Sequence, residues 1–134
     1  MAMESSLAQQ TPRILSIFRI LVGLLFFVHG LSKFFGIPPY TMGQVVFPNL
    51  IWFQGLIELV GGAMLALGLY TRAVAFLLCG DMAVAYFMSH APRGFFPQAN
   101  GGVAAVLYCW SFLLLIFTGG GAWSLDRAIR KSMD

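Results

Sequence analysis

The chain has 134 residues, of which 59% are hydrophobic and only 10% are charged. Soluble domains carry roughly 25% charged residues, so this composition excludes an ordinary water-soluble protein and predicts a single domain, residues 1–134, in a lipid bilayer. The net charge of +3 comes from basic residues near the ends of apolar blocks. That placement indicates membrane topology and gives no support to nucleic-acid binding.

Four apolar blocks are long enough to cross the membrane as helices, at about 13–35, 50–69, 72–88 and 102–117. About 20 helical residues, rising about 1.5 Å each, span the roughly 30 Å of hydrocarbon. Gly36 followed by Pro38 and Pro39 ends the first block, because proline lacks the backbone N–H that a helix needs. The sequence therefore predicts an all-α, membrane-spanning four-helix bundle.

The connections between the blocks predict the orientation of the bundle. With four crossings, Arg13, Arg72 and the basic C-terminal residues share one side, and the positive-inside rule makes both termini cytoplasmic. Thr71 is placed to cap the third helix through its hydroxyl. Residues 124–131 predict a short interfacial helix with Ser124 as its N-cap. Two loops on the opposite face, 36–49 and 89–101, are nearly free of charge, and we expect them to pack onto the mouth of the bundle.

The apolar blocks contain five ionisable residues, which form a candidate intramembrane site: Arg19, His29, Lys33, Glu58 and Asp81. Such groups are costly at membrane depth unless they are paired or hydrated. Counting about 1.5 Å per residue places His29 and Glu58 at a similar depth. We therefore expect Glu58 to pair with His29 or Lys33, and the long side chain of Arg19 to reach Asp81.

Two interpretations of these charges remain open. They can neutralise one another and fix the register of the helices, or His29 and Glu58 can exchange protons near neutral pH if burial shifts their titration. Four histidine and carboxylate residues lie in the spans or at their ends: His29, Glu58, Asp81 and His90. They are not spaced as ligands that converge on a metal ion, so no metal site is expected.

Small residues predict where helices approach closely. Gly55, Gly61 and Gly62 flank Glu58, and Gly23 and Gly30 lie on the first block, as in small-residue interfaces in lipid. The two cysteines, Cys79 and Cys109, fall in different blocks without CxxC spacing. We interpret them as packing residues.

Several segments in this order resemble the DoxX family of small bacterial membrane proteins. They are Arg19–Gly23, His29–Lys33, Glu58–Gly62, Leu67–Arg72, Leu107–Tyr108 and Gly119–Leu125. The resemblance implies a four-helix bundle of the bacterial inner membrane and an association with oxidoreductase systems. It also implies that the family's polar motif residues are Arg19, His29, Lys33, Glu58, Thr71, Arg72 and Asp81.

The chain has no paired histidines for haem, no thiolate cluster and no flavin motif, so no intrinsic cofactor is expected. The first hypothesis is a small subunit or accessory protein of a quinone-linked redox process, with a bound quinone near His29 or Lys33 and a redox enzyme as partner. The alternative is a non-catalytic membrane scaffold. A third reading is a small-solute transporter or channel subunit, which four spans without an inverted repeat would build as a homo-oligomer.

Overall fold

The computed structural model describes residues 1–41 and 45–134, and all of the regular structure in them is helical. The long helices are α1 (Ala2–Phe35), α2 (Leu50–Leu67), α3 (Thr71–Ala85) and α5 (Val103–Thr118). A π-helical turn, η1 (Tyr86–His90), and a 3-10 turn, η2 (Ala91–Arg93), extend α3, and two short helices, α4 (Pro97–Asn100) and α6 (Leu125–Met133), complete the fold. The predicted all-α fold class is confirmed.

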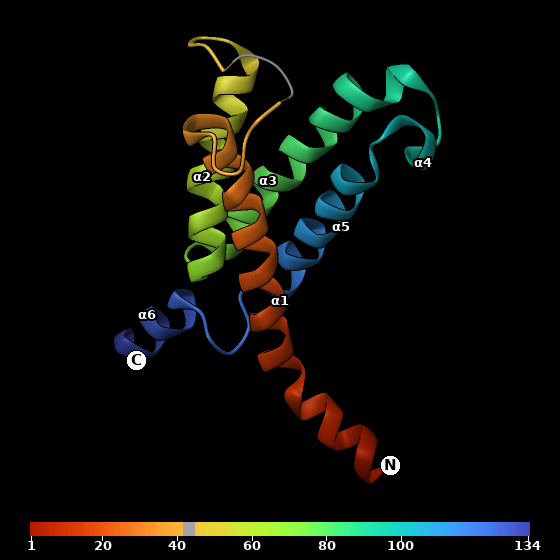
Figure 1. The fold of residues 1–134 in the computed structure, drawn as a ribbon. Coiled ribbons are helices and arrows are strands. Elements are labelled where there is room, and N and C mark those ends of the chain that lie inside the picture. The colour runs from red at the N-terminus through yellow and green to blue at the C-terminus, as the bar shows by residue number, and fades with distance from the viewer. Residues whose placement is uncertain (42–44) are drawn as a thin grey trace.

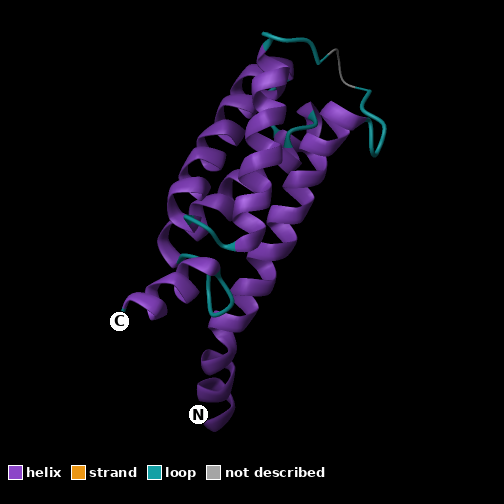
Figure 2. Ribbon diagram, turned by 90° about the vertical axis from the view of Figure 1, so that its left-hand side faces the viewer, coloured by secondary structure: helices purple, strands orange, loops and turns teal. Residues whose placement is uncertain are grey.

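Three of the helical stretches are long and apolar enough to cross a membrane: α1, α2 and the stretch Thr71–Arg93. Helix α5 is also apolar, but its 16 residues make it shorter than these three. Both termini lie at the same end of the bundle (Figures 1 and 2), as four antiparallel passes require. The side of the membrane that this end faces stays a prediction.

Helices α1 and α2 pack along each other at backbone distance, because glycines line their contact (Figure 1). A Cβ atom added to Gly23 would lie 2.6 Å from the backbone nitrogen of Ala66, and one added to Gly62 would lie 2.5 Å from that of Phe27. Real Cβ atoms do not come so close to a backbone, so neither position has room for a side chain. The small-residue interface predicted from the sequence is confirmed here.

Helices α3 and α5 form the second pair, and its core is apolar. Ala75, Leu78, Phe112 and Leu115 are buried there and join Phe26 of α1 in one cluster. Large apolar side chains also cover the outer faces of the spans, among them Leu25, Val60, Phe76, Trp110 and Leu114. A surface of this kind is suited to lipid rather than water.

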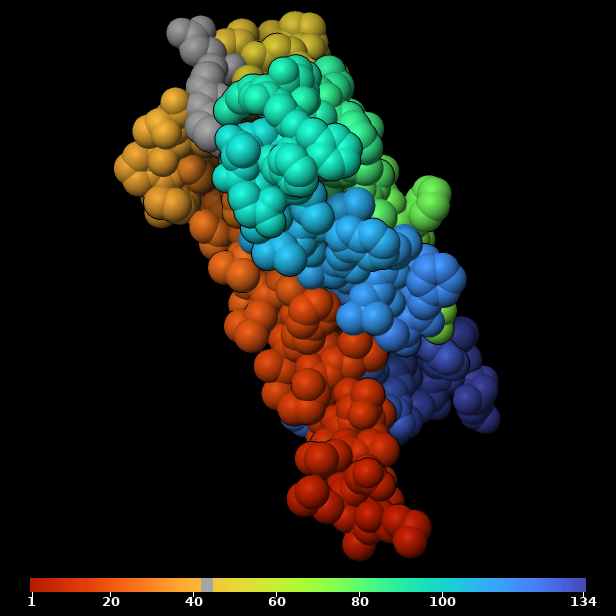
Figure 3. All heavy atoms as spheres, turned by 90° about the vertical axis from the view of Figure 1, so that its right-hand side faces the viewer, coloured from red at the N-terminus to blue at the C-terminus, as the bar shows by residue number. Residues whose placement is uncertain are grey.

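The first helix begins at Ala2 rather than near Arg13, and Pro12 lies inside it. Figure 3 shows this N-terminal part of α1 projecting beyond the rest of the molecule. A proline lacks only its own N–H, and the Pro12 carbonyl accepts a hydrogen bond of 2.9 Å from the backbone N–H of Ala122. The helix therefore continues through the proline and extends beyond the start of the predicted span.

The loop at 89–101 is held in shape by its buried Asn100 side chain, but Phe95 and Phe96 are exposed, so the loop does not pack onto the mouth of the bundle along its whole length as predicted. The Asn100 side chain donates to the Gly94 carbonyl at 2.9 Å and accepts from the Gly102 N–H at 2.8 Å. Part of the other predicted loop, residues 42–44, lies outside the described residues.

Candidate functional site

One buried ion pair joins α1 to α2. Lys33 Nζ, in the last turn of α1, lies 2.8 Å from Glu58 Oε1, in the middle of α2, and the two side chains are 6% and 4% exposed. Lys33 Nζ also donates to Gln54 Oε1 at 2.9 Å. A Cβ on Gly30 would lie 2.6 Å from the backbone nitrogen of Leu59, so the glycine allows the helices to meet at this level. Of the two partners predicted for Glu58, the structure selects Lys33.

Two carboxylate oxygens in this region have no hydrogen-bond partner among the described residues. They are Glu58 Oε2 and Asp81 Oδ2, and both are inaccessible to solvent. Asp81 lies on α3, and the charges of Glu58 and Lys33 act on its carboxyl group. The Lys33 ammonium group contacts the Glu58 carboxylate, and among the described residues Asp81 forms no ion pair with it. An unpaired buried carboxylate is costly, so this cluster of Lys33, Gln54, Glu58 and Asp81, the acid cluster, is incomplete as it stands.

The ring of His29 lies beside the acid cluster but does not bind Glu58. Its Nδ1 atom lies 2.9 Å from the Leu25 carbonyl, one turn earlier in α1, and the residue is exposed. The ring makes an edge-on contact with Tyr108 of α5, at a centroid distance of 5.6 Å, and a tilted contact with Phe26. The expected pairing of His29 with Glu58 is therefore wrong, because the histidine turns outward along its own helix.

Arg19 is fully buried and binds backbone carbonyls instead of a carboxylate. Its guanidinium donates to Gly120 O at 2.8 Å, to Leu65 O at 2.8 Å, to Ala66 O at 2.5 Å and to Trp123 O at 2.5 Å. The expected pairing with Asp81 is wrong. Leu65 and Ala66 lie in the last turn of α2, whose carbonyls lack helical partners, so the cation completes that helix end.

The start of α3 is capped from a distant part of the chain. Asp126 of α6 accepts from the Tyr70 N–H at 2.6 Å and from the Thr71 N–H at 2.8 Å. Burial acts to raise the pKa of Asp126, but these hydrogen bonds and the charge of Arg130 hold it below the ordinary value. The predicted cap through the Thr71 hydroxyl is wrong: Thr71 Oγ1 is buried without a hydrogen-bond partner in the described part of the chain.

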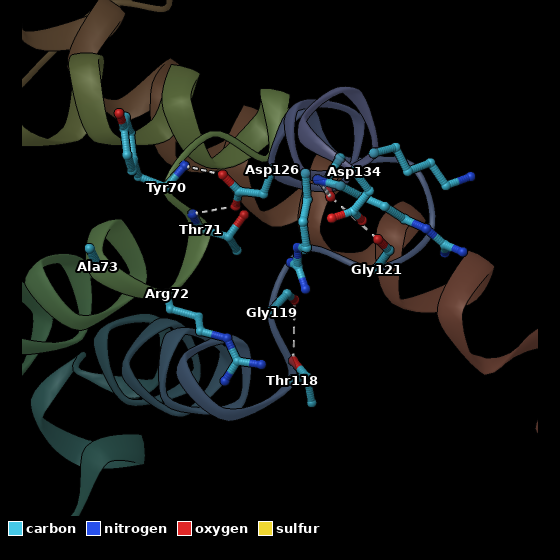
Figure 4. A pocket seen from close by; sticks show the side chains of 14 residues that line it. Tyr70, Thr71, Arg72, Ala73, Thr118, Gly119, Gly121, Asp126 and Asp134 are labelled. Atoms are coloured by element: carbon cyan, nitrogen blue, oxygen red, sulfur yellow. Dashed lines mark hydrogen bonds between the residues drawn. The ribbon is translucent and has the colours of Figure 1, made fainter.

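A basic pocket of about 710 Å³ opens at the same end of the molecule (Figure 4). It lies between the start of α3, the turn after α5 and helix α6, and four cationic side chains line it: Arg72, Arg127, Arg130 and Lys131. Arg72 also donates to the Ile116 and Phe117 carbonyls at the end of α5, at 3.0 Å and 2.9 Å. The predicted motif residue Arg72 thus closes a helix end and adds to the positive charge of this surface.

The two cysteines meet in space, which their spacing did not indicate. Cys79 Sγ of α3 lies 3.6 Å from Cys109 Sγ of α5, and both thiols are free. Each residue is partly exposed on the α3/α5 pair. The cysteines meet because of the register between the two helices. The sequence does not specify that register, so it contains no signal for this contact. Within residues 1–41 and 45–134, no three His, Cys, Asp or Glu side chains gather as a metal site would require.

Comparison with known proteins places the chain in a family. The model of the DoxX family matches residues 14–91, which cover α1, α2 and α3 with its π-helical extension. The chain belongs to the DoxX family. The DoxX resemblance seen in the sequence is thereby confirmed. No solved structure matches the chain.

Curated relatives of this DoxX-family protein extend over most of its length. A protein of Haemophilus influenzae named only "Uncharacterized protein" is 42% identical over 95% of this chain and 98% of its own. "Putative oxidoreductase CatD" of Bacillus subtilis is 39% identical over 84% of each chain. "Inner membrane protein YqjF" of Escherichia coli is 29% identical over 84% of this chain and 89% of its own. The family and these relatives confirm a multi-pass protein of the inner membrane.

Proposed function

We propose that this DoxX-family protein is a small accessory subunit of a quinone-linked redox process, and that its acid cluster holds the headgroup of a quinol. The observation that carries the proposal is the pair of unpartnered oxygens, Glu58 Oε2 and Asp81 Oδ2. A buried acceptor atom without a donor costs free energy, so a ligand that supplies a hydrogen-bond donor is stabilised there. A quinol brings two hydroxyl donors on one apolar ring.

The depth of the cluster suits such a ligand. Glu58 lies eight residues after Leu50, the first residue of α2, which corresponds to roughly 12 Å along the helix at about 1.5 Å per residue. A quinone dissolves in the hydrocarbon layer and presents its polar ring near this level. The aromatic ring of Tyr108, which packs on the buried Phe26 at a centroid distance of 5.4 Å, supplies an apolar side chain near the cluster.

Entry to the acid cluster requires the two helix pairs to part. The α1/α2 pair and the α3/α5 pair diverge toward the end that carries the loops (Figure 1), and the cluster takes Lys33 and Glu58 from the first pair and Asp81 from the second. A headgroup that enters from this end meets the carboxylates of both pairs. The redox role of the proposal is supported by the name of the relative CatD, an oxidoreductase by that description.

The first test is whether quinone accompanies the protein. The protein is extracted in mild detergent from a membrane that contains ubiquinone, and its bound lipids are identified by mass spectrometry. We expect bound quinone or quinol, and we expect Glu58→Gln to weaken binding of decylubiquinol, titrated without oxygen, by about tenfold, the effect of losing one charge-assisted hydrogen bond of about 1.4 kcal/mol.

Glu4→Gln is the matched control, because Glu4 is exposed and bonds only to the N-terminal amine. This variant keeps the affinity of the original protein. If Glu58→Gln unfolds, which a thermal unfolding curve reveals, Asp81→Asn takes its place. A protein that carries no quinone and binds none on titration overturns the proposal and leaves the scaffold as the better description.

A further inference from the structure

We propose that Cys79 and Cys109 form a redox-active dithiol, which a membrane quinone oxidises to an intramolecular disulfide. The inference rests on the proposed function only in its choice of quinone as the oxidant. The geometry that supports it is the 3.6 Å contact between the two sulfur atoms across α3 and α5. These are the only cysteines in the chain, so any disulfide within one molecule joins this pair.

The sulfurs are close enough to react after a small movement. A covalent S–S bond is about 2.0 Å long, so the two atoms of this contact must approach by roughly 1.5 Å. Rotation about the Cα–Cβ bonds and a slight shift of α5 supply such a movement. Cys109 Sγ also points toward the Cys79 backbone, with its sulfur 3.5 Å from the Cys79 carbonyl oxygen. Both side chains thus already point toward each other.

The depth of the pair selects the kind of oxidant. Cys79 lies eight residues after Thr71, and Cys109 lies nine residues before Thr118, which places both roughly 12–14 Å from the terminal end of the bundle at about 1.5 Å per residue. Water-soluble thiols and disulfides do not enter hydrocarbon at this depth. A quinone does, and both cysteines are partly exposed on the outer face of the helix pair.

The reaction balances with a quinone as the acceptor. The two S–H bonds break and one S–S bond forms, which releases two electrons and two protons. Both electrons and both protons pass to the quinone, whose two carbonyl oxygens become the hydroxyls of a quinol. The dithiol is oxidised and the quinone is reduced, with no further reactant.

The test counts thiols in the whole protein. Protein in detergent micelles is reduced, freed of reductant and incubated without oxygen with decylubiquinone, and a parallel sample receives no quinone. After denaturation in SDS, free thiols are labelled with a maleimide and the intact mass is measured. We expect the quinone sample to lose both thiols and the mass of two hydrogen atoms, and to form one quinol per protein.

Cys79→Ser and Cys109→Ser are the matched controls, since each keeps a thiol that has no partner and should stay fully labelled. Retention of both thiols in the original protein, or a disulfide that links two molecules on a non-reducing gel, overturns the inference. Quinone that binds while both thiols remain free would leave the proposed function standing. Oxidation of the pair that proceeds equally in Glu58→Gln supports the dithiol and shows that it does not depend on the acid cluster, whose own test is the binding measurement.

Discussion

The bundle contains two buried ionic centres, and they differ in how completely their polar groups are paired. At the terminal end, Arg19 uses its guanidinium on four backbone carbonyls, and Asp126 accepts from two backbone N–H groups. Near the other end, Lys33 pairs with Glu58 but not with Asp81, and each carboxylate keeps an oxygen without a partner in the described part of the chain. The Thr71 hydroxyl at the terminal end is also buried without a partner among the described residues, but that group is neutral, whereas the charged groups of this end are hydrogen-bonded. A centre whose charges are paired stabilises a fold, whereas a charged group with an unused acceptor atom has capacity for a ligand or a proton. The comparison assigns structure to the first centre and function to the second.

Replacement of Arg19 should have the largest effect on stability. Arg19→Met removes four hydrogen bonds to backbone carbonyls at once, although the Leu65 carbonyl keeps the Gly68 N–H as a donor, and we expect a loss of about 3–5 kcal/mol in the free energy of unfolding, or failure to fold. Reversible unfolding in SDS measures it. Arg13→Met is the control, because the exposed Arg13 bonds only to the side chain of Gln10. Equal stability of the two variants would show that the centre at Arg19 is not structural.

A side chain added between α1 and α2 should have the second-largest effect on stability. In Gly62→Ala the new Cβ meets the Phe27 backbone at 2.5 Å, so the helices must separate, with an expected loss of about 2 kcal/mol. Gly80→Ala on α3 has open space around its new Cβ and should gain about 0.5–1 kcal/mol, as alanine does in place of glycine within a helix. The same unfolding assay compares them. The Lys33–Glu58 contact would also loosen in Gly62→Ala, so quinone binding should weaken in that variant alone.

Removal of the Asp126 cap should cost about 1 kcal/mol, the usual value of a helix cap. Asp126→Ala tests it by thermal unfolding, with Asp134→Ala as a control at an exposed acid. The original protein should also lose this stabilisation in acid. Because hydrogen bonds hold the pKa of Asp126 in the folded protein below its ordinary value of 3.8, its contribution is complete above that value and falls as the pH drops through the lower folded value. A variant whose acid sensitivity equals that of the original protein would contradict the cap.

The smallest change in stability is expected at the acid cluster. Lys33→Met combined with Glu58→Met replaces the ion pair by apolar side chains, and such replacements are often neutral or stabilising because the desolvation of both charges is avoided. We expect a change within about 1 kcal/mol, together with loss of decylubiquinol binding. A large loss of stability with binding intact would reverse the roles assigned to the two centres.

The contacts that could be predicted from the sequence are those between α1 and α2, two helices that follow each other along the chain. Helical phase and depth were sufficient to limit the partner of Glu58 to His29 or Lys33, of which the structure has Lys33, and the glycine spacing was sufficient to place α1 against α2. Arg19 was matched with the wrong partner, because depth arguments consider charged side chains and its true acceptors are backbone carbonyls.

The remaining features depend on long-range geometry that local patterns do not encode. The Asp126 cap joins α6 to the start of α3, and the contact of Cys79 with Cys109 depends on the register of α3 against α5. A sequence pattern shows which residues share one face of a helix, but not how far one helix is shifted along its neighbour. Even the unpartnered oxygens of the acid cluster became visible only once all neighbours of Glu58 and Asp81 were in place.

The acceptors of Arg19 also bear on how the protein is made. Arg19 enters the membrane with the first span, yet two of its carbonyl partners, Gly120 and Trp123, are synthesised only after the fourth. During translation the guanidinium can bind its two acceptors on α2 but lacks the other two. The hydrogen bonding of the early α1/α2 pair is therefore incomplete at that stage. Folding around Arg19 is thus complete only when the segment after α5 has been synthesised, about a hundred residues after Arg19 itself.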